Sequence, residues 1–354
     1  MQMLKYLFML MCTSSIGYCN VSNPLSAPSS FYKTDDAKEI AATLLLYQHD
    51  NGGWPKNYDW NKKLSDSDKK KLLDEKKRDE DATFDNSATH TEIRFLDKMY
   101  VATKNPLYKD AALKGLNFIL TAQYPNGGFA QFPCRKKGYY TQITFNDGAM
   151  IGVLDVLKNI RDNKLLADIT DDALRARCGQ AIEKGIDCIL KTQIRVDGKP
   201  ALWCAQHDKD TLAPVIARAY ELPSFSGSES VGIVRFLMSI DKPSAEVVAS
   251  IEGAVAFFER LKINGIRVEA KPLADGTKDH VVVDDPAAPP MWARFYDLKT
   301  LKPFFCSRDG VPREKLSDIS FERRNGYSWL GYYPASLLEK DYPAWKKRIG
   351  SSPQ

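Results

Sequence analysis

The chain has 354 residues, of which 44% are hydrophobic and 27% are charged, and its formal net charge is +5. A chain of this length and composition can bury one large core or two modest ones, which excludes disorder on a large scale. The charge is far below that of the dense basic stripes that mark nucleic-acid binders. We therefore expect no nucleic-acid partner and only a weak preference for acidic partners.

The first residues have the features of a secretory signal. Lys5 is followed by a short apolar run from Tyr6 to Cys12, and small residues suited to cleavage come next. No apolar run reaches the roughly 20 residues that a membrane-spanning helix needs, so we predict no membrane partner. We interpret residues 1–19 as a signal peptide, residues 20–30 as a linker rich in Ser, Pro and Asn, and residues 31–354 as a single domain, secreted or periplasmic.

Helical periodicity dominates the chain after the linker. Four segments carry apolar residues at helical spacing along one face, and we predict that they are amphipathic outer helices: Ala37–Gln48, Leu107–Gln123, Asp171–Gln193 and Ser244–Ile263. Three segments between them are apolar on more of their circumference and should lie deeper as inner helices. These inner segments start near Asp85, Asp147 and Ser228.

Two short motifs recur along the chain. In the first, a glutamine leads to a glycine turn and then an aromatic residue, as in Gln48 to Trp54, Gln123 to Phe129 and Gln193 to Trp203. The second is Thr83-Phe-Asp-Asn86, Thr144-Phe-Asn-Asp147 and Ser226-Gly-Ser-Glu229, where polar residues are expected to open each inner helix as N-caps.

Three helical hairpins related by repetition can bury their apolar faces only against one another, and closure into a ring removes the exposed ends. We therefore predict an all-α-dominated fold, an incomplete (α/α)3 toroid of helical hairpins. A few short β-strands are expected near the C-terminus, in the segments Gly265–Asp285 and Phe295–Phe305.

The sequence lacks a nucleophile elbow, a phosphate-binding glycine loop, an HExxH motif and a dinucleotide fingerprint. Acidic residues remain at the mouths of the inner helices, where an isolated aspartate is more often a helix cap. In a toroid, however, Asp85 and Asp147 would face the same site. Two such carboxylates suit calcium, and they equally suit the acid and base of an inverting glycosidase; spacing in the sequence does not choose between these.

Three arginines lie in loops that contain aromatic residues: Arg218, Arg294 and Arg308. Each one alone is more often a solvated surface residue, and Arg218 could simply pair with Glu221. Together they indicate an anionic ligand, because the planar guanidinium matches the geometry of a carboxylate.

These clusters resemble those of the family 10 polysaccharide lyases, the pectate lyases with an incomplete α/α toroid. The similarity extends from about Lys38 to Pro334. The most specific parts of the similarity are Gly52-Gly-Trp-Pro-Lys56-Asn57, Thr83-Phe-Asp85-Asn86, Phe145-Asn-Asp147, Arg218-Ala-Tyr220-Glu-Leu-Pro-Ser224 and Ser307-Arg308-Asp-Gly310. Two departures from the family pattern are Ser87, where related sequences often carry glycine, and the bulky Phe84.

The resemblance implies a role for each matching residue. Asp85 and Asp147 would hold a calcium ion, Ca2+, and Arg308 would be the catalytic base. The residues expected to bind the uronate substrate are Lys56, Asn86, Arg218, Tyr220 and Arg294.

The implied protein is a monomeric pectate lyase with one catalytic domain, residues 31–354. It would cleave polygalacturonate by calcium-assisted anti-β-elimination and release 4,5-unsaturated oligogalacturonides. Two alternatives stay open at this point. An inverting glycoside hydrolase would use Asp85 and Asp147 as its acid and base. A non-catalytic uronan-binding protein would need only the basic residues.

Overall fold

The computed structural model describes residues 23–350 of the chain. The predicted signal peptide, residues 1–19, lies outside the described residues. Within residues 23–350, no helix is long and apolar enough to cross a membrane. Part of the predicted linker is ordered, since Pro24–Ser26 forms a 3-10 helix that contacts α3 (His90–Thr103).

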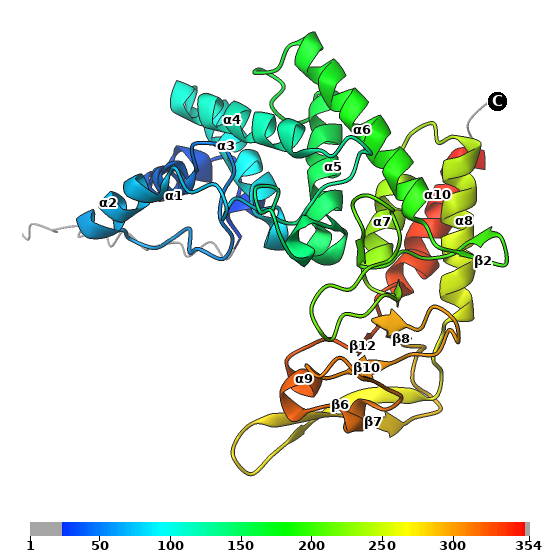
Figure 1. Cartoon of the computed structure of the whole chain (residues 1–354). Helices are drawn as coiled ribbons and strands as arrows, with labels where there is room; N and C mark the ends of the chain where they lie inside the picture. The colour runs from blue at the N-terminus through cyan, green and yellow to red at the C-terminus, as the bar shows by residue number, and fades with distance from the viewer. Residues whose placement is uncertain (1–22, 351–354) are drawn as a thin grey trace, which may run out of the picture.

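Helical hairpins form the upper part of the molecule (Figure 1). The inner helix of each hairpin packs against the outer helix that follows it, and inner helices also contact inner ones. The inner helices are α3, α5 (Ala149–Arg161) and α7 (Glu229–Met238). The outer helices are α1 (Asp35–Tyr47), α4 (Pro106–Ala122), α6 (Asp172–Thr192) and α8 (Ala245–Arg260). The prediction of a mainly helical fold, with these helices in these places, is confirmed.

The repeated glutamines tie the hairpins together. Gln48 Nε2 donates to Gly52 O in its own turn, at 3.0 Å, and to Ala111 O in the next outer helix, at 2.9 Å. Gln123 and Gln193 make the same pair of bonds, to carbonyls of Ala181 in α6 and Ser250 in α8 and to the turns that follow each glutamine. The repeated glutamine therefore links each turn to the neighbouring outer helix.

The N-cap residues of the outer helices cap them with their side chains, but the N-cap residues of the inner helices do not. Thr34, Asn105, Asp171 and Ser244 each accept a backbone N–H in the first turn of an outer helix. The N-cap residues of the inner helices, Thr89, Gly148 and Ser228, make no such bond. Of the second motif, Ser226 accepts the backbone N–H of Glu229, the first residue of α7, at 3.1 Å, so the expected capping is confirmed at that helix. The expectation is wrong for α3 and α5, and capping does not explain Asp85 or Asp147.

A smaller part with short strands lies beneath the helices (Figure 1). Its longest strands, β6 (Ile266–Pro272) and β7 (Lys278–Asp284), form an antiparallel hairpin within the predicted segment Gly265–Asp285. The short antiparallel pairs are β5 (Phe225–Ser226) with β9 (Phe295–Tyr296), β8 (Trp292–Ala293) with β12 (Leu330–Gly331), and β10 (Phe305–Cys306) with β11 (Pro312–Arg313).

This part has its own aromatic core, in which Tyr220, Phe295, Phe305 and Trp329 are buried. It positions the loops that carry Arg294 and Arg308. The remaining α-helices are α2 (Asp66–Glu75), α9 (Phe321–Asn325) and α10 (Tyr342–Gly350). The remaining strand pairs are β1 (Ile143–Thr144) with β4 (Gln206–His207) and β2 (Arg195–Val196) with β3 (Lys199–Pro200).

Candidate active site

The two predicted metal ligands lie in neighbouring loops. The short 3-10 helix Asp85–Ser87 precedes α3, the short 3-10 helix Asn146–Gly148 precedes α5, and the two contact each other. Asp85 is only 1% exposed. Its Oδ2 accepts a hydrogen bond from Lys56 Nζ, whereas its buried Oδ1 has no hydrogen-bond partner among residues 23–350.

The backbone of these loops adopts the left-handed conformation at successive non-glycine residues. Asn86 has a φ of 48°, Ser87 of 67° and Asp147 of 52°. This conformation is costly for residues other than glycine and collects at functional sites.

The surroundings of Asp147 mix both signs of charge. Loss of hydration, and then the charge of Asp85, raise the pKa of the Asp147 carboxyl, although the residue reaches the surface. Arg294 and Arg218 act in the opposite direction, and Glu229 adds to the rise. Asp147 therefore lies within electrostatic range of all four side chains, which come from both parts of the molecule.

Arg294 is held from two sides. Its Nη2 donates to the Glu229 carboxylate and, at 3.1 Å, to Asn146 Oδ1. The guanidinium carbon lies 4.6 Å from the centre of the Tyr327 ring. Burial has the largest single effect and lowers the pKa of Arg294. The charges of Glu229 and Asp147, together with Tyr327 and Tyr333, outweigh burial and raise the pKa, so this arginine is a fixed cation.

Arg218 is positioned in a similar way. Its Nε donates to Glu221 Oε2 at 2.7 Å, and the hydroxyl of Tyr327 donates to the other oxygen of Glu221 at 2.7 Å. The guanidinium lies 5.1 Å from the centre of the Tyr220 ring. Burial opposes the charge of Arg218, yet the hydrogen bond and charge of Glu221 raise its pKa.

Arg308 lies at the edge of this group. Its side chain is 66% exposed and forms an ion pair with Glu322, with Nη2 donating to Oε1 at 2.9 Å. The hydrogen bond and charge of Glu322 raise the pKa of Arg308. The guanidinium lies 5.8 Å from the Tyr220 ring centre, so Arg218 and Arg308 share this ring as a neighbour. Burial beside other cations would favour the neutral form of an arginine, but in this structure Arg308 is not buried.

The structure thus gathers the predicted residues, with Asn86 donating to Asn57 Oδ1 at 2.9 Å beside Lys56. It also adds residues that the sequence interpretation missed: Glu221, Tyr327 and Glu229. Glu229 is the last residue of the third copy of the second motif, as Asn86 and Asp147 are the last residues of the first two copies. This repeat could have identified Glu229 as a site residue. Tyr327 stands in no motif, and only the fold brings it between Arg218 and Arg294.

The carboxylates fit a single hard cation. Calcium takes oxygen ligands. The buried Oδ1 of Asp85, which has no hydrogen-bond partner within residues 23–350, offers one such ligand beside Asp147. Within the described residues, no group of three or more His, Cys, Asp or Glu side chains could hold a metal. A calcium ion held by Asp85 and Asp147 would therefore need further oxygen ligands from water or substrate.

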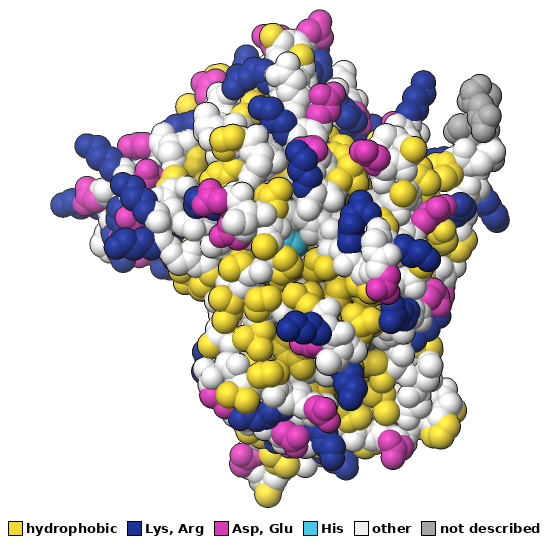
Figure 2. Space-filling view, turned by 45° about the vertical axis from the view of Figure 1, so that its right-hand side comes forward, with side chains coloured by type: hydrophobic (Ala, Val, Ile, Leu, Met, Phe, Trp, Pro, Cys, Tyr) yellow, Lys and Arg dark blue, Asp and Glu magenta, His cyan; other side chains and the backbone are white. Residues whose placement is uncertain are grey.

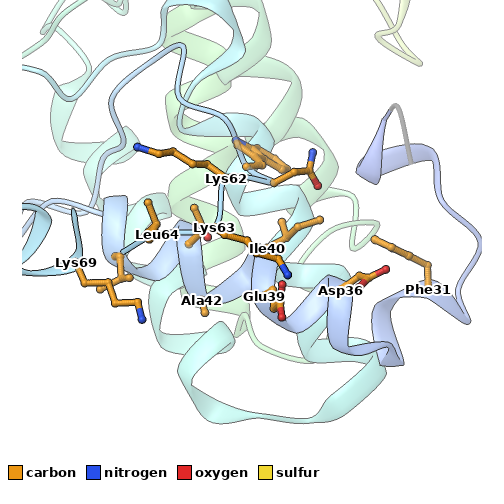
Figure 3. Close-up of a pocket in the computed structure, with 13 residues that line it drawn as sticks. Phe31, Asp36, Glu39, Ile40, Ala42, Lys62, Lys63, Leu64 and Lys69 are labelled. Carbon is orange, nitrogen blue, oxygen red and sulfur yellow. The ribbon is translucent and has the colours of Figure 1, made fainter. Parts of the chain in front are cut away.

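Pockets lie next to the site and away from it. A pocket of about 320 Å³ is lined by Lys56, Asn57 and Asn86 together with Glu92 of α3. Another, of about 400 Å³, lies between α1 and the segment before α2, and it is lined by Glu39, Lys62 and Lys63 but by no predicted site residue (Figure 3). Figure 2 shows a band of side chains of the hydrophobic class across the middle of this face, with a basic side chain within it.

Comparison with known proteins gives a consistent result. The family model described as "Pectic acid lyase" matches residues 48–338. The chain is 36% identical to a solved structure of a mutant of the family 10 polysaccharide lyase from Cellvibrio cellulosa in complex with trigalacturonic acid, with a TM-score of 0.77, and the match covers 89% of this chain and 95% of that one. A second structure of the enzyme from that organism is 36% identical, with a TM-score of 0.76 and coverage of 91% and 95%. No curated protein is a significant match to this chain. The chain therefore belongs to the pectic acid lyase family and is a polysaccharide lyase.

Proposed function

We propose that this polysaccharide lyase cleaves polygalacturonate by calcium-assisted anti-β-elimination on an incomplete (α/α)3 toroid. The observation that carries the proposal is the buried Asp85 Oδ1, which has no partner among residues 23–350 and lies in the loop next to Asp147. Lys56, Arg218 and Arg294 supply the positive charge that a polyuronate needs. The trigalacturonic acid complex of the related enzyme supports the same substrate class.

The reaction removes the proton on C5, next to a carboxylate, and expels the C4 oxygen. Calcium, when bound, supplies a Lewis acid that stabilises the charge developing on the substrate carboxylate. Arg294 is suited to hold a uronate carboxylate, because Glu229 and Asn146 fix its orientation. Lys56 and Asn86 adjoin Asp85 and are suited to hold the same sugar or its neighbour.

The base is proposed to be a guanidinium that has lost its proton. The sequence predicts Arg308 for this role, while the surroundings favour Arg218 as a second candidate, because Arg218 acts on Asp147 and is less exposed. An ordinary arginine is effectively always protonated. Since Glu322 and Glu221 raise the pKa values of these two arginines further, either arginine must separate from its carboxylate partner and approach other cations before it can accept a proton.

Secretion or a periplasmic location, and the monomeric state, remain predictions from the sequence. Membership in the lyase family favours elimination over hydrolysis, although the raised pKa of Asp147 is a property that the general acid of a hydrolase also needs.

Exhaustive chelation tests the metal assignment. We expect chelation to abolish the release of unsaturated products and calcium to restore it, because two protein carboxylates hold calcium weakly without substrate. Activity that survives chelation, or that returns with zinc and not with calcium, would rule out the assignment.

A further inference from the structure

A basic pocket of about 610 Å³ lies beside the site and has no role in the proposed chemistry. Its charged lining consists of Arg135, Lys136 and Lys209 against the single carboxylate of Asp210. Tyr124, Pro125, Asn126, Pro133 and Thr141 complete the lining. We call these residues the basic pocket.

The basic pocket adjoins the candidate active site through one aromatic ring. The guanidinium carbon of Arg135 lies 4.0 Å from the centre of the Phe132 ring, and Lys56 Nζ lies 5.7 Å from the same centre. Arg135 also lies 4.4 Å from the centre of the Tyr140 ring. Lys56 in the site and Arg135 in the pocket therefore share Phe132 as a neighbour.

The walls of the pocket are held in place by hydrogen bonds between separate loops. The Tyr124 hydroxyl donates to Thr141 O at 2.7 Å, and the Asn126 side chain donates to Lys209 O at 2.7 Å. The backbone N–H of Lys209 donates to Gln142 Oε1 at 2.9 Å. These bonds use backbone groups of Thr141 and Lys209. The side chain of Lys209 takes no part in them, so its replacement leaves the bonds in place.

The positions along the chain keep the pocket within reach of a polymer in the site. Thr141 precedes Asp147 by six residues, and an extended chain spans at most about 3.5 Å per residue, so the two lie no more than about 20 Å apart. A polymer with one carboxylate on each sugar can therefore place one unit at the calcium ligands and a later unit in the basic pocket.

We propose that the basic pocket binds the carboxylate of a further galacturonate unit of the same chain and makes the enzyme favour long substrates. This inference rests on the polygalacturonate substrate of the proposed function. Lys136 and Lys209 are the residues that would contact the carboxylate. Lys209 Nζ pairs with Asp210 Oδ2 at 2.7 Å, so a uronate would compete with Asp210 for this lysine. Arg135 is partly engaged by Glu80 O, at 3.2 Å, and by Asp81.

The test compares the double variant Lys136→Ala/Lys209→Ala with the wild type on trigalacturonate and on polygalacturonate. On the polymer, kcat/KM should fall about threefold to tenfold through a higher KM, as expected for two solvent-exposed charge contacts. On trigalacturonate it should not change. The control Lys271→Ala/Lys278→Ala removes the same charge from the exposed β6–β7 hairpin and should behave as the wild type.

A variant with the opposite expected effect on substrate binding sharpens the test. Asp210→Asn removes the only carboxylate of the pocket, so it should strengthen retardation in a gel that contains polygalacturonate, while the double lysine variant should weaken it. Equal losses on both substrates, no loss on the polymer, or the same loss in the hairpin control would overturn the inference. The gel measures binding without turnover. A wild type that is retarded normally but forms no unsaturated product would overturn the proposed function, and the gel would still decide the role of the pocket.

Discussion

Asp147 occupies the place in its loop that Asn86 occupies in the preceding repeat, and both residues have a left-handed backbone, with φ of 52° and 48°. The residue before each of them, Asn146 and Asp85 respectively, is buried. The two carboxylates of the candidate calcium site therefore come from adjacent positions of the repeat and not from equivalent ones, one of them buried and the other exposed.

Exchanging the side chains of one loop tests this arrangement. The variant Asn146→Asp/Asp147→Asn keeps composition and charge, and asparagine tolerates the left-handed backbone. It would move the carboxylate to the place where Asn146 accepts from Arg294 at 3.1 Å. We expect turnover to fall by about 100-fold or more because the cation and Arg294 are both misplaced, while thermal unfolding shows that the fold persists. Activity close to that of the wild type would mean that the position of this carboxylate does not matter.

The buried Glu92 of α3 predicts a pH dependence of stability. Burial raises the pKa of Glu92 to about 7, although Tyr58 and Thr91 donate to its carboxylate. The folded protein therefore holds this proton up to about pH 7, while the unfolded chain releases it near pH 4.3. Stability should fall as pH rises between these values and stay lower above them.

Glu92→Gln removes the loss of stability that the buried carboxylate of Glu92 causes at higher pH. The variant should be more stable than the wild type at pH 8, by up to about 3 kcal/mol, and this advantage should shrink at pH 5. Denaturant unfolding at both pH values measures it. Glu246→Gln, an exposed residue in the first turn of α8, is the matched control and should show little difference between the two. A pH-independent effect of Glu92→Gln would refute the linkage.

The repeated glutamines differ in burial, so we predict that truncating them to alanine lowers the free energy of unfolding by different amounts. Gln193→Ala removes two buried hydrogen bonds, to Ala201 O and Ser250 O, and should lower the free energy of unfolding by about 2 kcal/mol. Gln123→Ala removes the equivalent bonds at a partly buried position and should cost less. Chemical denaturation of both variants provides the comparison. If Gln193→Ala costs no more than Gln123→Ala, burial does not determine the strength of this link.

The sequence predicted the helices well because their apolar spacing determines which face is buried, and the repeats then place the loops. The sequence singled out Asp85 and Asp147 because short motifs surround them, and Arg294 because its loop contains aromatic residues. The pairing of Arg218 with Glu221 was expected only as a surface contact, and the fold instead makes it a half-buried one.

The rest of the site depends on contacts between distant parts of the chain. Tyr327 donates to Glu221 across 106 positions, and no local pattern encodes this. The capping role expected for the second motif failed at α3 and α5, although side chains cap the outer helices as the local rule predicts. At the inner helices, the left-handed backbone at Asn86 and Asp147 replaces the usual start of a helix.

Arginine variants identify the base. Whichever of Arg308 and Arg218 is the base should lose nearly all turnover as the alanine variant, and the lysine variant should also be severely impaired because it lacks the planar fork. The other alanine variant should mainly raise KM, as a carboxylate clamp does. Wild-type activity should rise towards alkaline pH as more neutral guanidine forms. If both alanine variants keep near-normal kcat, neither arginine is the base, and Lys56 is the next candidate.

The most direct measurement counts the ends that form when the wild-type protein degrades polygalacturonate with calcium present. Elimination creates one unsaturated, ultraviolet-absorbing end for every new reducing end, and we predict that the two rise together and stop together on chelation. New reducing ends without the corresponding absorbance would show hydrolysis and would contradict the account.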